Sequence, residues 1–298
     1  MTITNNARAQ EAADAADDAR AREQVYDAEE ARRARNRQIE GVARWLVPIA
    51  VVLMTLYLWN WLVVAYELPH YILPSPGRVW EQFILDREML GQSLLVTLRI
   101  TVMALGVAVA GGVLLAILFN QSRFAELVFY PYAVILQVTP IVSIAPLIFI
   151  YVTEPTIRVL ICAWLVAFFP ILSNTTLGLK STDHNLTDLF SIYGANRWQR
   201  LIRLQLPSAL PYFLGGLRIA GGLALIGAIV AEYVVGTGGA GSGLAFRILE
   251  ASYRLNIPRM FAALGLIAVV GVTIFAMTAL LSHFALRKWH ESAIRRDL

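Results

Sequence analysis

SIYGANRWQRLIRLQLPSALP, residues 191–211, is a half-polar segment that lies between two long apolar stretches of the chain. Its apolar residues recur at helical spacing, its arginines lie away from that stripe, and a glycine and two prolines interrupt it. Amphipathic basic helices of this kind either lie on a membrane surface or present an apolar face to a partner. The segment therefore predicts a structured polar loop between two membrane spans.

The composition of the whole chain predicts an integral membrane protein. Of its 298 residues, 57% are hydrophobic and 15% are charged, whereas soluble domains carry about 25% charged residues. The net charge of +4 needs no nucleic-acid partner, because membrane proteins collect basic residues on one side. The single cysteine, Cys162, excludes an intrachain disulfide, and the four histidines lack metal-ligand spacing, so we expect no metal site.

Six stretches are long and apolar enough to cross a bilayer, since a spanning helix needs about 20 apolar residues. These predicted spans lie near residues 44–66, 94–118, 127–152, 157–178, 210–235 and 261–286. The expected fold class is therefore all-α integral membrane. Basic residues gather before the first span, between the second and third, between the fourth and fifth, and after the sixth. The positive-inside rule makes these loops, and with them both termini, cytoplasmic.

Two regions differ in composition. Residues 1–40 are rich in Ala, Arg, Asp and Glu and have neither an apolar face nor the apolar core of a signal peptide. We expect them to form a charged cytoplasmic tail, either helical or disordered. Residues 41–298 are expected to form one membrane domain.

The longest cytoplasmic loop spans about 30 residues, where most connections are shorter, and predicts two short helices. On the first, one face carries the apolar side chains of Leu186, Leu189, Phe190 and Tyr193. Gly194 follows in the position where helices commonly end in a left-handed residue. The first helix is therefore expected to end at this glycine.

The second helix of the loop begins with a capping-box pattern, Asn196 with Gln199 three residues later. Pro207 is expected to end it, because proline lacks the backbone N–H that a helix uses. The apolar stripe expected on this helix consists of Trp198, Leu201, Ile202 and Leu206. From these residues alone, partner docking and lying on the membrane surface remain equally open.

The loop resembles the EAA loop of binding-protein-dependent ABC importer permeases. The pattern is an acidic residue six positions before a glycine, then an apolar–x–Leu–Pro ending; the matching residues are Asp188, Gly194, Leu204, Leu206 and Pro207. Asp188 and the two residues after it read Asp-Leu-Phe, where the family name implies Glu-Ala-Ala. That departure puts the usual acidic contact in doubt and makes Phe190 a large docking residue.

Other stretches are similar to the nitrate, sulfonate and taurine branch of that family, which also includes importers of thiamine precursors and riboflavin. They are LPSPGRVWEQF (73–83), VTPIVSIAPLIFI (138–150), FFPILSNTTLGL (168–179), LPSALPYFLGGLRIA (206–220) and IVAEYVVG (229–236). The resemblance runs from about residue 45 to residue 290. It implies that residues 41–298 adopt the type I ABC importer permease fold.

The resemblance also implies a set of partners. A separate cytoplasmic ATP-binding subunit would bind the loop and hold the ATP and Mg²⁺. This chain has no Walker A pattern, so the chain itself is expected to bind no cofactor and to be no enzyme. A solute-binding protein would deliver substrate, and two permeases, here identical, would form the pathway within the lipid of the bacterial inner membrane. The implied coupling residues are Asp188, Phe190, Tyr193, Gly194, Trp198, Leu201, Leu204, Leu206 and Pro207.

Candidate pathway or gate residues lie inside the predicted spans. Glu232 is a carboxylate deep in an apolar run, and charges inside membranes are costly and tend to be functional. We expect it either to line the external gate or to pair with an arginine. Pro140 and Pro146 interrupt the third span and Asn174 lies in the fourth, although packing explains each proline equally well. The paired glycines of the fifth span predict close helix packing.

Two other functions stay open. A stand-alone secondary transporter would work without ATP and usually shows an inverted repeat, of which the sequence gives no convincing sign. An intramembrane serine protease would pair Ser242 with His283, but Ser242 lies in a loop and alanine occupies position 240, where such enzymes have glycine. The glycine-rich stretch 236–243 follows no strand, so we expect no dinucleotide site there.

The sequence leaves the transported solute open. The predicted spans carry few fixed cations, which argues weakly against a bare inorganic anion. An aromatic heterocycle such as a pyrimidine or a flavin is therefore slightly preferred over a sulfonate, taurine or nitrate.

Overall fold

The computed structural model describes residue 43 and residues 46–235 and 241–287, and these contain helices and turns but no strand. Contacts divide the chain into two units, Met1–Leu68 and Pro69–Leu298. The charged stretch 1–40 and most of the glycine-rich stretch 236–243 lie outside the described residues. Within the described part, the all-helical fold class predicted from the sequence is confirmed.

The first unit contains one helix that is suited to spanning a membrane, Leu46–Ala65, with 20 residues and a mean hydropathy of 2.0. At 1.5 Å per residue this helix is about 30 Å long, the thickness of the hydrocarbon core of a bilayer. It agrees closely with the predicted span 44–66. The chain then turns through Glu67, which has a positive φ of 45°.

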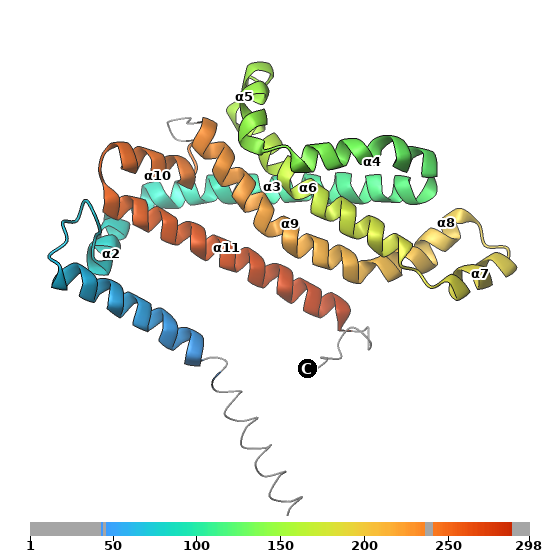
Figure 1. Cartoon of the computed structure of the whole chain (residues 1–298), viewed down its shortest axis with the longest axis horizontal. Coiled ribbons are helices and arrows are strands. Elements are labelled where there is room, and N and C mark those ends of the chain that lie inside the picture. The colour runs from blue at the N-terminus through green and yellow to red at the C-terminus, as the bar shows by residue number, and fades with distance from the viewer. Residues whose placement is uncertain (1–42, 44–45, 236–240, 288–298) are drawn as a thin grey trace, which may run out of the picture. The chain divides into compact units, whose positions relative to one another are not determined.

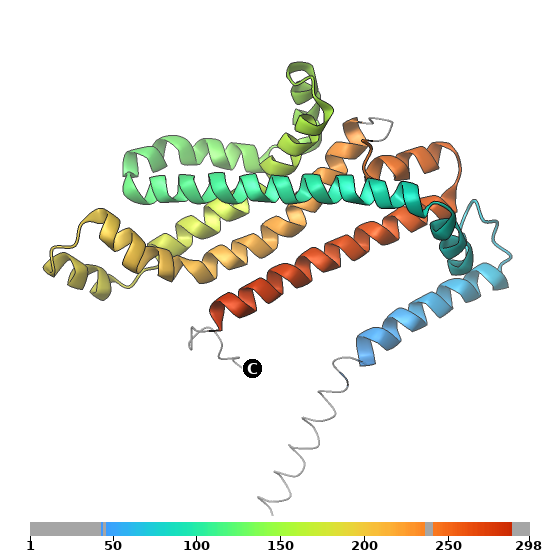
Figure 2. The same ribbon diagram turned by 180° about the vertical axis from the view of Figure 1, so that it is seen from behind.

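The second unit is built from ten helices and one π-helical turn within its described residues. They are α2 Pro76–Leu85, α3 Arg87–Gln121, α4 Arg123–Val138, α5 Ile141–Tyr151, α6 Pro155–Lys180, α7 His184–Ile192, α8 Arg197–Arg200, η1 Leu201–Gln205, α9 Leu206–Val235, α10 Leu244–Tyr253 and α11 Ile257–Leu286. Figures 1 and 2 show α7 and α8 at one end of this unit and α2 and α10 at the other. The long helices α3, α6, α9 and α11 connect the two ends.

The third predicted span, 127–152, is wrong as a single helix. The structure breaks it into α4 and α5, which are bent by 104° relative to each other. At the break, the Thr139 hydroxyl donates to the carbonyl of Ile135 at 2.6 Å, and Pro140 caps the start of α5. Pro140 has no N–H to donate to the α-helical ladder, and here the chain begins a new helix, whereas Pro131 and Pro146 are accommodated inside α4 and α5. The second unit therefore has four unbroken candidate spans and one broken one.

The core of the second unit consists mainly of small residues along α3, α6 and α9. Alanines such as Ala104, Ala163, Ala167 and Ala228 are fully buried. Lipid tails are as apolar as the helices themselves, so helices associate in a membrane through close packing, and small residues permit it. The prediction of close packing at Gly216 is confirmed, because a Cβ built there would lie 2.8 Å from the carbonyl oxygen of Pro170 on α6.

Other glycines in this core behave differently. Gly221 approaches α11, with 3.0 Å between its built Cβ and Cγ2 of Ile274, whereas Gly215 and Gly222 face open space. Gly227 supplies a further contact that the sequence reasoning missed, with 2.9 Å between its built Cβ and the Cα of Ala163. The α6–α9 contact therefore depends on Gly216 and Gly227.

Replacing Gly216 with alanine is expected to destabilise the protein by about 1–3 kcal/mol, because the added methyl group overpacks a contact made by backbone atoms. The matched control is Gly222→Ala on the same helix, where nothing lies within 4 Å of the built Cβ. That variant should be neutral or slightly stabilising, since alanine favours a helix by about 1 kcal/mol over glycine. Thermal unfolding in detergent measures both, and equal stability of the two variants would contradict the packing assignment.

Candidate functional site

The polar loop between α6 and α9 folds into an elbow made of α7, a tight turn and α8. α7 ends at Ile192 with Tyr193 as its C-cap, and Gly194 follows with φ of +69°. The N–H of Gly194 donates to Ser191 O at 3.0 Å and that of Ala195 donates to Phe190 O at 2.9 Å. These two bonds form a Schellman motif, in which a left-handed residue ends the helix. The predicted position of Gly194 is confirmed.

The capping box predicted at the start of the second loop helix is also present. Asn196 Oδ1 accepts from the N–H of Gln199 at 2.8 Å, and Gln199 Oε1 accepts from the N–H of Asn196 at 2.9 Å. The two halves of the elbow are joined by a bond from Arg200 Nη2 to Ser191 Oγ, 3.0 Å long. The turn between α7 and α8 is therefore fixed by both its backbone and its side chains.

The prediction that Pro207 ends the second loop helix is wrong. α8 continues through η1 into α9, and together they form one helix, Arg197–Val234, of 38 residues. In η1 the bonding shifts by one residue, so the N–H of Leu206 donates to the carbonyl of Leu201, five residues back. This wider turn lies directly before Pro207, whose ring would otherwise clash with the carbonyl four residues earlier. The elbow is thereby joined to α9 without a break.

The apolar residues of the elbow divide into two groups. Leu201 and Leu204 are both buried, and Leu201 packs into the core with Leu172 and Ala209, so these two residues face the protein interior and not a partner. Leu206 and Pro207 are half-buried, as is Phe190, and Asp188 is exposed. The single predicted stripe is therefore wrong. The exposed apolar surface of the elbow and the turn that follows it consists of Leu186, Leu189, Ile192, Tyr193, Trp198 and, from the predicted stripe, Ile202.

A groove of about 360 Å³ lies beside the break between α4 and α5. Pro140 and Thr139 line it at the break, Phe169 and Pro170 line it from α6, and Leu223 lines it from α9. These α6 and α9 residues lie near the middle of their helices. Broken backbone inside a membrane is tolerated only where it is buried in protein or lines a cavity. The groove therefore supplies the environment that the broken span requires.

Glu232 does not line this groove. It is 5% exposed and bonds two other elements at the opposite end of α9 from the elbow. Thr97 on α3 donates its hydroxyl to the Glu232 carboxyl at 2.8 Å, and the N–H of Ala245 in α10 donates to it at 3.1 Å. The N–H of Leu244 donates to Thr97 Oγ1 at 2.9 Å. We call these contacts among Glu232, Thr97 and the start of α10 the outer clasp, where outer means the end of the unit opposite the elbow.

The outer clasp supplies the N-terminal cap that α10 lacks. The cap position is Gly243, which has no side chain to accept the first N–H groups of the helix. A Cβ at Gly243 would lie 2.1 Å from the Glu232 carboxyl group. Gly243 has φ of −82° and ψ of −176°, an extended backbone that any residue adopts. Glycine is therefore needed here for space and not for conformation.

The remaining candidate pathway residues are not brought together with Pro140. Pro146 is exposed within α5 and lies outside the groove lining. Asn174 packs against Gly216 and donates its amide to the carbonyl of Pro170 at 2.8 Å. Of the four candidates, only Pro140 lines the groove. Sequence spacing could not reveal this, because it does not say which face of α6 meets α9.

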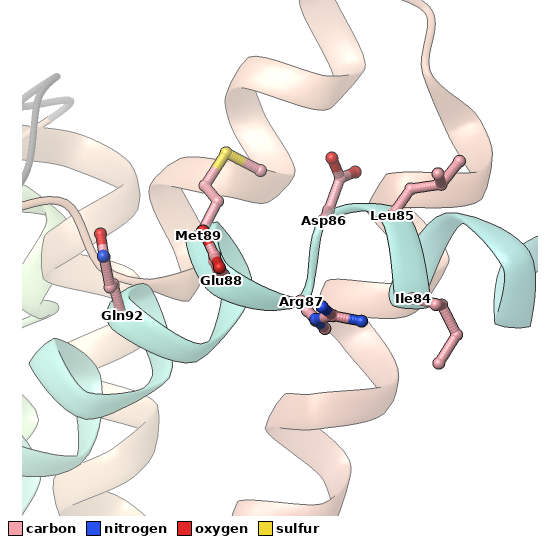
Figure 3. A pocket seen from close by; sticks show the side chains of 7 residues that line it. All are labelled: Ile84, Leu85, Asp86, Arg87, Glu88, Met89 and Gln92. Carbon is pink, nitrogen blue, oxygen red and sulfur yellow. The ribbon is translucent and has the colours of Figure 1, made fainter.

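The junction of α2 and α3 forms an open hollow of about 620 Å³ at the end of the unit that carries the outer clasp. Figure 3 shows that Asp86 and Arg87, adjacent at this junction, project in different directions. Asp86 accepts two bonds from the Arg259 guanidinium, at 2.6 and 2.9 Å, and one from Gln82 at 2.6 Å. This partly buried ion pair ties the start of α11 to the α2–α3 junction. The sequence reasoning missed it.

The proposed protease pair is not assembled. Ser242 is buried beside the start of α10, whereas His283 lies near the far end of α11, 26 residues after its first residue Ile257. At 1.5 Å per residue that separation along the helix is about 39 Å. A serine and a histidine must lie within hydrogen-bonding distance to act as nucleophile and base. The structure therefore gives no support to a Ser242–His283 dyad.

A chain with several apolar spans, one of them broken, and a protruding elbow joined to a span defines a membrane permease subunit. The family model described as "Binding-protein-dependent transport system inner membrane component" matches residues 87–296. The chain belongs to this family, and it is a permease component of an ABC importer. The family description places such components in the inner membrane, and the named relatives are transport permease proteins.

Relatives with known names agree with this assignment. The chain is 32% identical over 232 residues to a probable ABC transporter permease protein of Haemophilus influenzae, covering 78% of this chain and 93% of that protein. It is 33% identical to the formylaminopyrimidine transport permease protein ThiX of Halalkalibacterium halodurans, covering 78% and 91%. It is 31% identical to the riboflavin transport system permease protein RibX of Chloroflexus aurantiacus, covering 83% and 90%.

A solved structure supports the fold. A crystal structure of an amino acid ABC transporter with histidines matches with a TM-score of 0.58 at 17% identity, covering 68% of this chain and 96% of that one. This match confirms the predicted type I importer permease fold.

Replacing Gly243 with alanine is expected to open the outer clasp, because the new methyl group would occupy the space of the Glu232 carboxyl group. We expect a loss of about 1–3 kcal/mol in stability, typical of overpacking a tight contact. Gly241→Ala is the control, since nothing lies within 4 Å of a Cβ at Gly241. Thermal unfolding and limited proteolysis of the α9–α10 connection report the change. A Gly243→Ala protein as stable and as resistant as the control would show that the clasp does not depend on this glycine.

Proposed function

We propose that a separate ATP-binding subunit grips the α7–α8 elbow of this importer permease and drives transport by moving it. The observation that carries this proposal is an exposed apolar elbow that continues without a break into α9. Tyr193 and Ile192 are each 82% exposed, and Trp198 is 63% exposed, on a loop that is too polar to lie in hydrocarbon. Burying one such side chain in a partner contributes roughly 1.5–3 kcal/mol.

The way the elbow is attached to the core supports the proposal that its movement is passed on to α9. Leu201 holds its base in the core, while the Schellman motif at Gly194 and the capping box at Asn196 fix its turn. A rigid elbow on a continuous helix passes a displacement along α9 instead of absorbing it. The transport cycle is then a population shift between states, driven by contacts that differ between nucleotide conditions.

The remaining partners follow from the same importer architecture. A solute-binding protein delivers the solute at the end of the unit that carries the outer clasp, and a second copy of this chain completes the pathway. The elbow side is cytoplasmic, with both termini on that side, and the spans lie in the lipid of the bacterial inner membrane. ATP and Mg²⁺ bind to the ATP-binding subunit, and this chain itself holds no cofactor or metal.

We infer that the solute is a small organic molecule with a flat, largely apolar body, such as a pyrimidine or a flavin-like heterocycle. Relatives of this chain are named for formylaminopyrimidine, riboflavin, aliphatic sulfonates and nitrate. The groove at the α4–α5 break favours the first two. Phe169 offers an aromatic face, Gln137 and Thr139 offer hydrogen bonds, and the lining contains no charged side chain to balance a bare anion.

A stand-alone secondary transporter is the rival function, and reconstitution separates the two. The full chain is placed in liposomes with and without its ATP-binding subunit and solute-binding protein. We expect uptake only when both proteins are present and ATP is supplied on the side of the membrane that holds the ATP-binding subunit. Uptake by the chain alone, driven by an ion gradient, would refute the ATP-driven mechanism.

Replacing Leu189 with alanine is expected to weaken retention of the ATP-binding subunit by roughly tenfold, since it removes part of the apolar surface that the partner buries. The matched control is Leu264→Ala on α11, because Leu189 and Leu264 are 45% and 44% exposed. The control should retain the subunit as the unchanged protein does. Quantitative co-purification in detergent measures both, and equal retention would exclude a docking role for the α7 face.

Replacing Gln137 with alanine is expected to raise the KM for uptake by roughly fivefold, because loss of one hydrogen bond to the solute costs about 1 kcal/mol. Retention of the ATP-binding subunit should not change, since Gln137 lies in the groove and not on the elbow. Ser143→Ala is the control, a polar truncation in α5 outside the groove lining. Uptake assays in liposomes give the values, and an unchanged KM for Gln137→Ala would remove this groove from the pathway.

A further inference from the structure

A basic hollow of about 530 Å³ lies at the elbow end of the second unit, where α3 meets α4 and where α8 begins. Its charged lining consists of three arginines and contains no carboxylate. The arginines are Arg123 on α4 and Arg197 and Arg200 on α8, and the amides of Asn120, Gln121 and Gln205 complete the main lining. Three cations gathered around one hollow with no fixed anion indicate a site for an anionic ligand.

The three arginines have no acidic partner among the described residues. Glu126, at this end of the unit, forms an ion pair with Lys180 and not with any of the three arginines. Arg200 donates one Nη to Ser191, but its Nε is buried without a hydrogen-bond partner among the described residues. A buried charged donor that lacks an acceptor is costly, so an external acceptor in the hollow would be stabilising.

The shape of the hollow is fixed by bonds that do not use the arginines. Asn120 Nδ2 donates to Gln205 Oε1 at 2.7 Å and thereby joins the end of α3 to η1. Ser122 Oγ accepts from the N–H of Ala125 at 3.2 Å and caps α4. These bonds hold the walls in place, so the backbone positions that carry the three arginines are fixed before any ligand arrives. Such preorganisation lowers the entropic cost of binding.

Planar guanidinium groups match the oxygens of a phosphate group, which they bind through paired hydrogen bonds. The hollow lies where spanning helices end, at the level where lipid headgroups are expected. Beside it, α4 presents apolar side chains to its surroundings, with Phe124 78% exposed and Leu127, one turn after Arg123, 65% exposed. A ligand that carries a phosphate group next to a hydrocarbon chain matches both the basic hollow and the apolar face of α4.

We propose that this hollow binds the phosphate headgroup of an anionic phospholipid, whose acyl chains lie along the exposed apolar face of α4. Basic pockets at the ends of membrane helices are suited to such headgroups. The site is independent of the transported solute, and it holds Arg197 and Arg200 at the base of the elbow. The bound lipid would therefore tie the start of α8 to the corner between α3 and α4.

The decisive variant is Gln205→Glu. A glutamate at this position can still accept the bond from Asn120, so the walls of the hollow are preserved, but it places a negative charge among the three arginines. We expect binding of phosphatidylglycerol to weaken about tenfold, as expected when charge-assisted hydrogen bonds are lost. The matched control is Gln199→Glu, the same chemical change six residues earlier, where glutamate also completes a capping box. The control should bind within twofold of the unchanged protein.

Binding is measured on the full chain in mixed micelles by native mass spectrometry, titrating phosphatidylglycerol against a phosphatidylcholine background. Inorganic phosphate is added in a separate arm. Saturable binding of phosphatidylglycerol that inorganic phosphate displaces only weakly supports the proposal. Displacement by inorganic phosphate at the same concentration as the lipid would instead identify a site for a soluble anion and overturn it.

Two further outcomes would also overturn the proposal. One is a Gln205→Glu protein that binds phosphatidylglycerol as tightly as the control. The other is normal lipid binding together with loss of the ATP-binding subunit, which would assign the arginines to protein docking. If Gln205→Glu fails to fold, as judged by thermal unfolding, Arg123→Gln replaces it with Arg203→Gln as its control. Both are exposed arginines, and Arg203 lies outside the lining of the hollow.

Discussion

The close contact between α6 and α9 is the constraint on which the rest of the second unit depends. At Gly216 and Gly227 the α6 backbone approaches so closely that a methyl group would collide with it. In a membrane, where apolar side chains gain little by leaving lipid, this fit of surfaces largely decides which helices pair. The pair supplies two walls of the groove, and α9 carries the elbow at one end and the outer clasp at the other.

Placing the elbow and the outer clasp on one helix links the two ends of the permease mechanically. The helix Arg197–Val234 has 38 residues, which gives about 57 Å at 1.5 Å per residue. Glu232 near its outer end holds Thr97 on α3 and the start of α10. Leu201 near its other end holds the elbow in the core. A displacement of the elbow that moves α9 as a body therefore reaches the groove and the clasp together.

Local sequence signals predicted local structure well and predicted partners in space poorly. The Schellman turn at Gly194 and the capping box at Asn196 were predictable because each depends on residues within one or two turns. Glu232 was expected to line a gate or pair with an arginine, whereas the structure places it against Thr97 and Ala245. These partners come from other elements, and no spacing rule connects them with Glu232. Pro207 misled the prediction because a widened turn accommodates a proline that an ordinary α-helix would not.

The π-helical turn at Leu201–Gln205 has a consequence for how the elbow is aimed. Each residue of an α-helix advances the side chains by about 100° around the axis, so one extra residue in a turn changes the rotational phase of everything beyond it. α8 and α7 are thus pointed in a direction that the register of α9 alone would not give. The direction of the elbow is therefore set at this turn, whereas the pairing of α9 with α6 is set further along the helix, at Gly216 and Gly227.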